Sequence, residues 1–423
     1  MKHYFLSFFF VLFTIPLFAG MILIPMDPDQ KNHLKAYGVT YWVLSQDVEA
    51  YWLLNYRGGS FAFMHTRAFE RECILRDVSY EVISNAQFNR IREEISNPAV
   101  NQEVIKLEVA PRVAVYTPDY NPYDDGIQPW GDAVTQVLDY AEIPYDKVYD
   151  REVLDGRLAD YDWLHLHHED FTGQYGKFYR AYHAHTWYRN HVAALEGLAA
   201  DLGFEKVTHL KSAVVERIRE YVAGGGFMFA MCSATDTYDI ALAAKGIDIA
   251  AEIYDGDPAD PNANEKLDFT RTFAFRDFEL EMDPLVYRYS NIDPKTRQVS
   301  PSMDYFTLFD FSAKWDPVPT MLTQNHTRTV KGFMGQTTSF QLDLIKPTVV
   351  VMGKNEGLNE ARYIHGTFGD GFWSFYGGHD PEDYTHRVGD PEVDLNLHPN
   401  SPGYRLILNN ILFPAARKKE RKT

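Results

Sequence analysis

The stretch that decides the fold is GGGFMFAMCSATDTYDIAL, residues 224–242. Its three glycines end a helix, the apolar run Phe227–Met231 has the composition of a buried parallel strand, and a helical pattern follows at once. Cys232 stands between strand and helix, flanked by the small residues Ser233 and Ala234. In α/β enzymes such a turn holds a nucleophile above the carboxyl edge of the sheet, and the following helix N-terminus favours a thiolate. The alternative is a buried cysteine that happens to end a strand.

Strand and helix patterns alternate on both sides of this stretch. We expect strands at 113–117, 143–148, 162–167, 227–231, 349–352, 361–367 and 372–376, and helices at 132–140, 183–202, 207–222 and 235–244. Repeated strand–helix–strand units predict an α/β domain over residues 110–416, with an open, mostly parallel sheet and helices on both faces. Between about residues 248 and 345 the pattern breaks into loops and antiparallel-looking segments.

Two further regions precede this domain. Residues 1–20 have a short basic start, an apolar run and small residues at the end, which is the layout of a secretory signal peptide. Residues 21–109 are expected to form a small α+β module, with helices at 29–37 and 85–96 and strands at 39–44 and 50–56. The chain is therefore predicted to be exported to the periplasm or the cell exterior, with no membrane span left after cleavage.

Charge and cysteine content narrow the function classes. The chain has 41 basic and 59 acidic side chains and a net charge of −18, which disfavours nucleic acid as a partner. Its one basic run is the tail at 417–423, expected to be solvated. Cys73 and Cys232 are the only cysteines, so an oxidising compartment would permit one disulfide between them. No CxxC pair is present, which excludes a zinc site built on cysteines.

A second motif, FWSFYGGHDPED at residues 372–383, follows the last expected strand. His379 stands just past the strand end, with Asp380 and Glu382 one and three residues further on. A nucleophilic cysteine needs a base, and the base needs a carboxylate that orients it. Cys232, His379 and Glu382 therefore form a candidate catalytic set, with Asp380 as the less favoured carboxylate. The alternative is a polar turn that caps a strand.

The order of these motifs resembles class I glutamine amidotransferases, over about residues 112–414. The resemblance implies a flavodoxin-like sheet and the chemistry of amide hydrolysis. It implies that Cys232 attacks the amide, that His379 is the base and that Glu382 orients it.

The whole chain also resembles a family of exported bacterial proteins often named asparagine synthetase B. The shared stretches are ILIPMDPDQKNHLKAYGVTYW at 22–42, HLHHEDFTGQYGKF at 165–178 and GGHDPEDYTHRVGDPEVDLNLHPNSPGYRLILNN at 377–410. The sequence contains neither an SGGxDS loop nor a GxxxxGK[ST] loop, so ATP-dependent synthesis is not expected.

A third motif, HLHHED at residues 165–170, ends another expected strand. Open α/β sheets place ligand sites at that edge. His165, His167 and His168, with Glu169 and His183 or His185, could bind zinc, although no HExxH motif supports a metal site. The alternatives are a hydrogen-bonded polar cluster at a strand end, or a substrate-binding set that contains His167, His168, Glu169 and Asp380.

Two functions follow from these residues. The first is a Cys-His-Glu hydrolase of amide or acyl bonds that acts on a small amide, a peptide or a glycan. The second is a non-catalytic binding domain for a glycan, a peptide or a protein partner. Neither needs a cofactor, and zinc at the histidines is the one metal that the sequence suggests.

Overall fold

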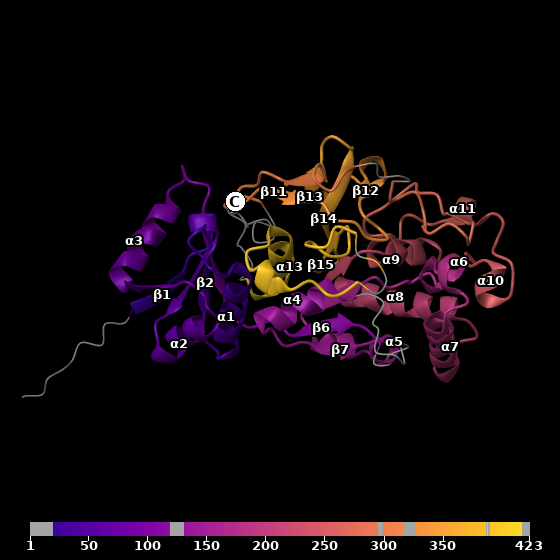
Figure 1. Ribbon diagram of the computed structural model, residues 1–423, viewed down its shortest axis with the longest axis horizontal. Coiled ribbons are helices and arrows are strands. Elements are labelled where there is room, and N and C mark those ends of the chain that lie inside the picture. The colour runs from indigo at the N-terminus through magenta and orange to yellow at the C-terminus, as the bar shows by residue number, and fades with distance from the viewer. Residues whose placement is uncertain are drawn as a thin grey trace, which may run out of the picture.

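The computed structural model describes residues 20–118, 131–294, 299–316, 327–385, 387 and 390–416. Apart from Gly20, the predicted signal peptide lies outside these residues, and so does the predicted basic tail. The described residues contain two β-sheets, which lie side by side along the long axis of the molecule (Figure 1).

The first sheet is antiparallel, with the strand order β4-β1-β3-β2-β5. Its strands are β1 (Gly20–Ile24), β2 (Ala50–Leu54), β3 (Ser60–Met64), β4 (Glu81–Ser84) and β5 (Glu103–Leu107), and its helices are α1 (His33–Ser45), α2 (Arg67–Leu75) and α3 (Asn85–Ser96). The predicted strand at 39–44 is wrong, because these residues belong to α1. The side chain of Asn32 caps α1 by accepting from the N–H of Lys35, and burial of the helix overrides the β propensity of its valines.

The second sheet is mixed, with the order β11-β10-β13-β14-β15-β9-β8-β6-β7 and β12 beside β14. Its strands are β6 (Val113–Tyr116), β7 (Asp146–Val148), β8 (Trp163–His167), β9 (Phe227–Met231), β10 (Tyr305–Leu308), β11 (Thr329–Lys331), β12 (Phe340–Gln341), β13 (Val350–Asn355), β14 (Glu360–Phe368) and β15 (Gly371–Tyr376). The helices connected to it are α4 (Ala133–Ala141), α5 (Asp150–Leu154), α6 (Tyr179–Tyr182), α7 (Thr186–Asp201), α8 (Val207–Ala223), α9 (Ala234–Ala243), α10 (Glu252–Asp255), α11 (Ala263–Lys266) and α13 (Pro402–Leu412).

The prediction of an open, mostly parallel, flavodoxin-like sheet with helices on both faces is wrong. Parallel pairing is confined to β15, β9, β8, β6 and β7, whereas β10 to β14 pair antiparallel with their neighbours. The chain also holds a separate antiparallel sheet. Short strands within residues 305–341 supply much of the antiparallel part, and their two to four residues are too few to give a clear alternating pattern.

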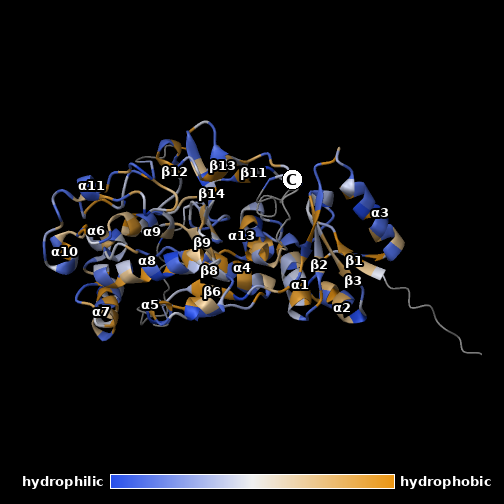
Figure 2. Cartoon of the chain, turned by 180° about the vertical axis from the view of Figure 1, so that it is seen from behind, coloured by the Kyte–Doolittle hydropathy of each residue, from blue (hydrophilic) through white to orange (hydrophobic). Residues whose placement is uncertain are grey.

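One continuous apolar core joins the two sheets through α1, α4 and α13. These three helices lie between the sheets in Figure 1. Figure 2 shows hydrophobic colouring on the strands in the middle of the molecule and hydrophilic residues along much of α3. The first sheet is therefore packed onto the second and is not simply tethered to it.

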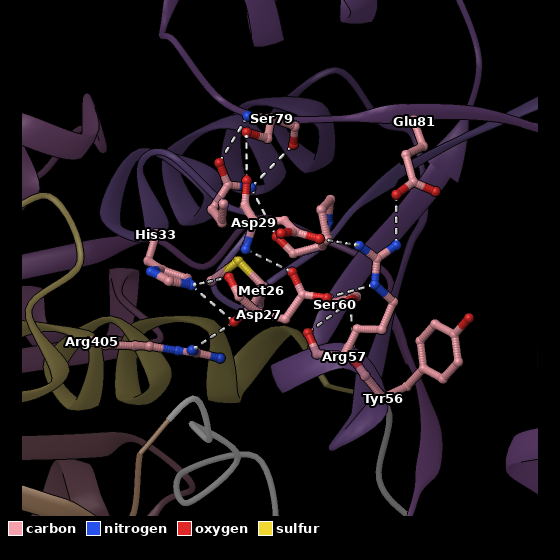
Figure 3. Close-up of polar contacts among 12 residues, drawn as sticks. Met26, Asp27, Asp29, His33, Tyr56, Arg57, Ser60, Ser79, Glu81 and Arg405 are labelled. Atoms are coloured by element: carbon pink, nitrogen blue, oxygen red, sulfur yellow. Dashed lines mark hydrogen bonds and ion pairs between the residues drawn. The ribbon is translucent and has the colours of Figure 1, made fainter.

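Arg405 of α13 supplies polar contacts at this junction (Figure 3). Its guanidinium is fully buried and donates to the hydroxyl of Tyr37 at 3.0 Å, to the carbonyl of Met26 at 3.5 Å and to the carbonyl of Gly58. The Nε2 atom of His33 lies 2.9 Å from the same Met26 carbonyl. A buried charge is tolerated only when it is hydrogen-bonded, so these carbonyls fix how α13 sits against the first sheet.

Among the described residues, no helix combines the length and the apolar character that a bilayer crossing requires.

Helices α1 and α4 approach most closely at Gly38, where an added Cβ atom would overlap the carbonyl group of Ala141. We predict that Gly38→Ala forces the two helices apart and lowers the free energy of unfolding by about 2 kcal/mol or more, as overpacking does. Gly197→Ala is the matched control, because Gly197 lies in α7 with nothing within 4 Å of an added Cβ. Urea unfolding should show the control to be neutral or stabilised by up to about 1 kcal/mol. Equal stabilities of the two variants would contradict the close approach.

Candidate functional site

The candidate site lies at the carboxyl edge of the parallel strands. In the register of β8, β9 and β15, His167 lies beside Met231, and Met231 lies beside Tyr376. Each of these residues ends its strand, so the segments that follow leave the sheet next to one another. His168, Cys232 and the turn that carries His379 come together for this reason.

Cys232 occupies the turn between β9 and α9 with a φ of 53°, in the left-handed region that non-glycine residues rarely adopt. Its N–H donates to the carbonyl of Gly378 at 3.1 Å, which ties this turn to the one after β15. The backbone N–H groups of Gln336, Thr337 and Ser233 lie within hydrogen-bond reach of the sulfur. Burial leaves the residue 3% exposed and raises the pKa of the thiol.

The two cysteines are free and buried. Cys73 lies on α2 beside the first sheet, where burial raises the pKa of its thiol to about 12. The disulfide that the sequence would permit is therefore not formed.

His167, His168 and His379 form a compact group, which we call the histidine cluster. The ring centroids of His167 and His379 lie 4.6 Å apart, those of His167 and His168 4.5 Å, and those of His168 and His379 5.7 Å. One nitrogen from each ring lies within 4.8 Å of the other two. The structure thus brings together three of the predicted site residues from two distant motifs.

Asp132 contacts the histidine cluster through His167. Its carboxylate caps α4 by accepting from the N–H groups of Val134 and Thr135, and it lies 3.0 Å from Nδ1 of His167. His165, predicted to be a metal ligand, contacts the same carboxylate at 3.3 Å and the carbonyl of Phe229. Burial lowers the pKa of His165, which keeps its ring neutral. The prediction did not include Asp132, although its place at the start of an expected helix is an N-cap signal.

Asp380 and Glu382 follow His379 directly in the chain. The carboxylate of Glu382 pairs with Nδ1 of His398 at 3.2 Å. Asp380 accepts from the N–H of Glu382 at 2.9 Å and interacts with the hydroxyl of Tyr404. The structure therefore pairs Glu382 with His398, a partner that the sequence analysis did not include.

Glu169, predicted to bind substrate, joins a buried network behind the histidine cluster. Lys211 lies 3.8 Å from its carboxylate and 3.1 Å from that of Asp150, and it donates to the hydroxyl of Tyr116 at 2.9 Å. Burial raises the pKa of Glu169 to about 7. Lys211 therefore links the carboxylates of Glu169 and Asp150.

The segment at 335–337 lies against the thiol. The amide of Gln336 donates to the carbonyl of Gly176 at 2.8 Å, so the segment at 335–337 is held against the loop at 170–177. A Cβ atom at Gly335 would lie 3.1 Å from the sulfur of Cys232 and 2.9 Å from the backbone nitrogen of His379. Gly335 therefore packs closely against both groups, and a larger residue would not fit there.

Asp236, in the first turn of α9, is one of the groups whose charge raises the pKa of the Cys232 thiol. Its carboxyl group accepts from the hydroxyl of Thr337 at 2.8 Å, and burial raises its pKa to about 8. Below that pH the group is neutral. Above it, the carboxylate charge opposes formation of the Cys232 thiolate, as a like charge does.

We predict that Asp236→Asn speeds alkylation of Cys232 above about pH 8 and leaves the rate unchanged below it. The expected gain is about threefold, the size of a charge–charge interaction of about 0.7 kcal/mol. Iodoacetamide labelling at a series of pH values, followed by peptide mass spectrometry, measures it, with Cys73 as the internal reference. A pH-independent ratio between the two proteins would contradict the assignment.

Comparisons with known proteins give no family. No protein-family model matches the chain, and no curated protein matches it. Among solved structures, the chain is similar to the cytoplasmic protein STM3548 from Salmonella typhimurium, with 14% identity, a TM-score of 0.36, and coverage of 73% of this chain and 100% of that one. The cytoplasmic protein STM1381 from Salmonella typhimurium LT2 matches at 12% identity and a TM-score of 0.35, and the match covers 72% of this chain and 99% of that one. A β-galactosidase from Bacillus circulans sp. alkalophilus matches at 12% identity and a TM-score of 0.25, and the match covers 74% of this chain and 32% of that one. Likeness at this level supports no transfer of function.

Proposed function

We propose that the protein is a thiol-dependent hydrolase of amide or related acyl bonds, with Cys232 as the nucleophile. The observation that carries the proposal is the left-handed backbone of Cys232 at the junction of β9 and α9. A non-glycine residue in this region costs of order 1–3 kcal/mol and persists where the surrounding structure enforces it, often at functional sites. Strained strand-to-helix turns present nucleophiles in this way.

The surroundings of the sulfur suit acyl transfer. Backbone hydrogen bonds from Gln336, Thr337 and Ser233 lower the pKa of the thiol, and α9 begins two residues further on. Both features stabilise negative charge, first on the thiolate and then on the oxyanion of a tetrahedral intermediate. They counter the burial that raises the pKa of the thiol.

His379 is the proposed proton acceptor, because its turn is hydrogen-bonded to the turn of Cys232 through Gly378 and both turns pack against Gly335. The imidazole takes the thiol proton as sulfur bonds to the acyl carbon, and it returns that proton to the nitrogen as the C–N bond breaks. Water then hydrolyses the thioester and restores the thiol. Packing against His167 and His168 holds the His379 ring in place, while Glu382 orients His398.

Substrate must reach a sulfur that is 3% exposed. We expect the segment at 335–337 to move aside, which would break the hydrogen bond between Gln336 and Gly176. The sequence of residues 1–20 supports export, so the substrate would be a small amide or peptide outside the cytoplasm.

The buried, protonated thiol specifically favours a second candidate, a non-catalytic domain. In that case the same edge binds a glycan, a peptide or a protein partner through His167, His168 and Glu169, and Cys232 only packs.

An activated ester separates the two candidates. We predict that p-nitrophenyl acetate acylates Cys232, seen as an acetyl group on its peptide by mass spectrometry. Cys232→Ala should abolish this product, and His379→Asn should slow its formation by about 100-fold, as expected for the loss of a general base.

Cys73→Ala is the matched control and should acylate at the wild-type rate, because Cys73 lies by the other sheet. A wild-type protein that stays unmodified at Cys232 while it is folded would overturn the hydrolase and leave the binding domain.

A further inference from the structure

We propose that His167, His168 and His379 bind a divalent transition metal, with Zn²⁺ as the best match, and that this ion controls the reactivity of Cys232. The site itself stands without the proposed function, whereas the control of Cys232 rests on it. The three rings come from the ends of β8 and β15, and one nitrogen of each lies within 4.8 Å of the others.

The spacing of the three nitrogens is compatible with coordination of a cation. Zinc binds imidazole nitrogen at about 2.0–2.1 Å, which places ligand atoms in a tetrahedral site about 3.4 Å apart, within the separation that the three nitrogens already show. Small movements of the rings would complete the site. Three nitrogen donors favour Zn²⁺ over Mg²⁺ or Ca²⁺, which prefer oxygen.

His167 gives an independent sign of a ligand. The residue is 2% exposed, and its Nδ1 faces the carboxylate of Asp132 at 3.0 Å. Neither ring nitrogen makes a well-aligned hydrogen bond among the residues that the structure describes: Nδ1 has only the charge contact with Asp132, and Nε2 is buried without a partner. A buried polar atom without a partner is costly, and a metal ion would satisfy it.

Asp132 is the positioning residue of this site. Ligating histidines usually direct their second nitrogen to a carboxylate, which fixes the tautomer and strengthens the donor. Here the carboxylate of Asp132 holds Nδ1 of His167 and so leaves Nε2 for the ion. The charge of that carboxylate also helps to balance a dication held by three neutral ligands.

Metal binding would alter the proposed chemistry at Cys232. A nitrogen of His379 that coordinates an ion has no lone pair left to accept a proton. Among the described residues, no cluster of three possible metal ligands includes Cys232. The ion would therefore bind near the thiol without being coordinated by its sulfur. Occupied protein would be the inactive form and metal-free protein the active one.

The binding test uses the full chain after removal of metal with a chelator. Titration with Co²⁺ should give the visible absorption of a tetrahedral nitrogen site at one equivalent, and Zn²⁺ should displace it. His168→Ala and His379→Ala should lose this signal, while Asp132→Asn should weaken binding by about 10–100-fold.

Two controls keep the binding test specific. His183→Ala should bind as the wild type does, because His183 is exposed and lies outside the histidine cluster. Cys232→Ser should bind with an unchanged spectrum. His168 is only half-buried, so loss of binding in His168→Ala is not a folding defect if the far-ultraviolet circular dichroism is unchanged. Absence of a saturable Co²⁺ signal in the wild type, or an equal signal in His168→Ala, would overturn the site.

The second arm measures acylation of Cys232 with and without one equivalent of Zn²⁺. We expect the ion to lower the rate by at least tenfold in the wild type and to have no effect in His168→Ala. An unchanged rate in zinc-loaded wild type would overturn the control of Cys232 and leave the metal site. Zinc binding by a protein whose Cys232 reacts in neither state would overturn the proposed hydrolase and leave the site as a metal centre alone.

Discussion

The pairing register of β8, β9 and β15 is the constraint on which the site depends. His167, Met231 and Tyr376 lie in one row across the three strands. Because side chains alternate between the two faces of a strand, a shift by one residue would turn His167 to the opposite face. The thiol, the histidine cluster and Asp132 meet only in this register. The backbone hydrogen bonds between these strands therefore bring the site residues together, and side-chain contacts adjust their positions.

Cys232 and the histidine cluster make different demands on the same imidazole. A general base needs a free lone pair on His379, whereas a metal ion would use that lone pair. The surroundings do not favour one role over the other, because Asp132 strengthens His167 as a ligand while Gly378 joins the turn of His379 to that of Cys232. The chemistry of this edge would then depend on how much metal the compartment supplies.

Sequence patterns located the parts of the site that are local. The turn at Cys232, the strand before it and the strand before His379 follow from short apolar runs and glycines, and the structure has all three. The partner of Glu382 could not be read in this way, because His398 comes from a loop whose path depends on the packing of α13. The prediction of a mostly parallel sheet was wrong for a related reason. Strands of two to four residues, such as β11 and β12, form only where a neighbour pairs with them.

Arg405 has a consequence for how the polypeptide matures. Its buried guanidinium completes hydrogen bonds to Met26 and Gly58, near the other end of the chain, and α13 shares a core with α1. During synthesis, the earliest strands leave the ribosome long before the last helix can cover them. The first sheet therefore keeps part of its apolar surface in water until α13 has been synthesised, and apolar surface exposed in this way promotes aggregation.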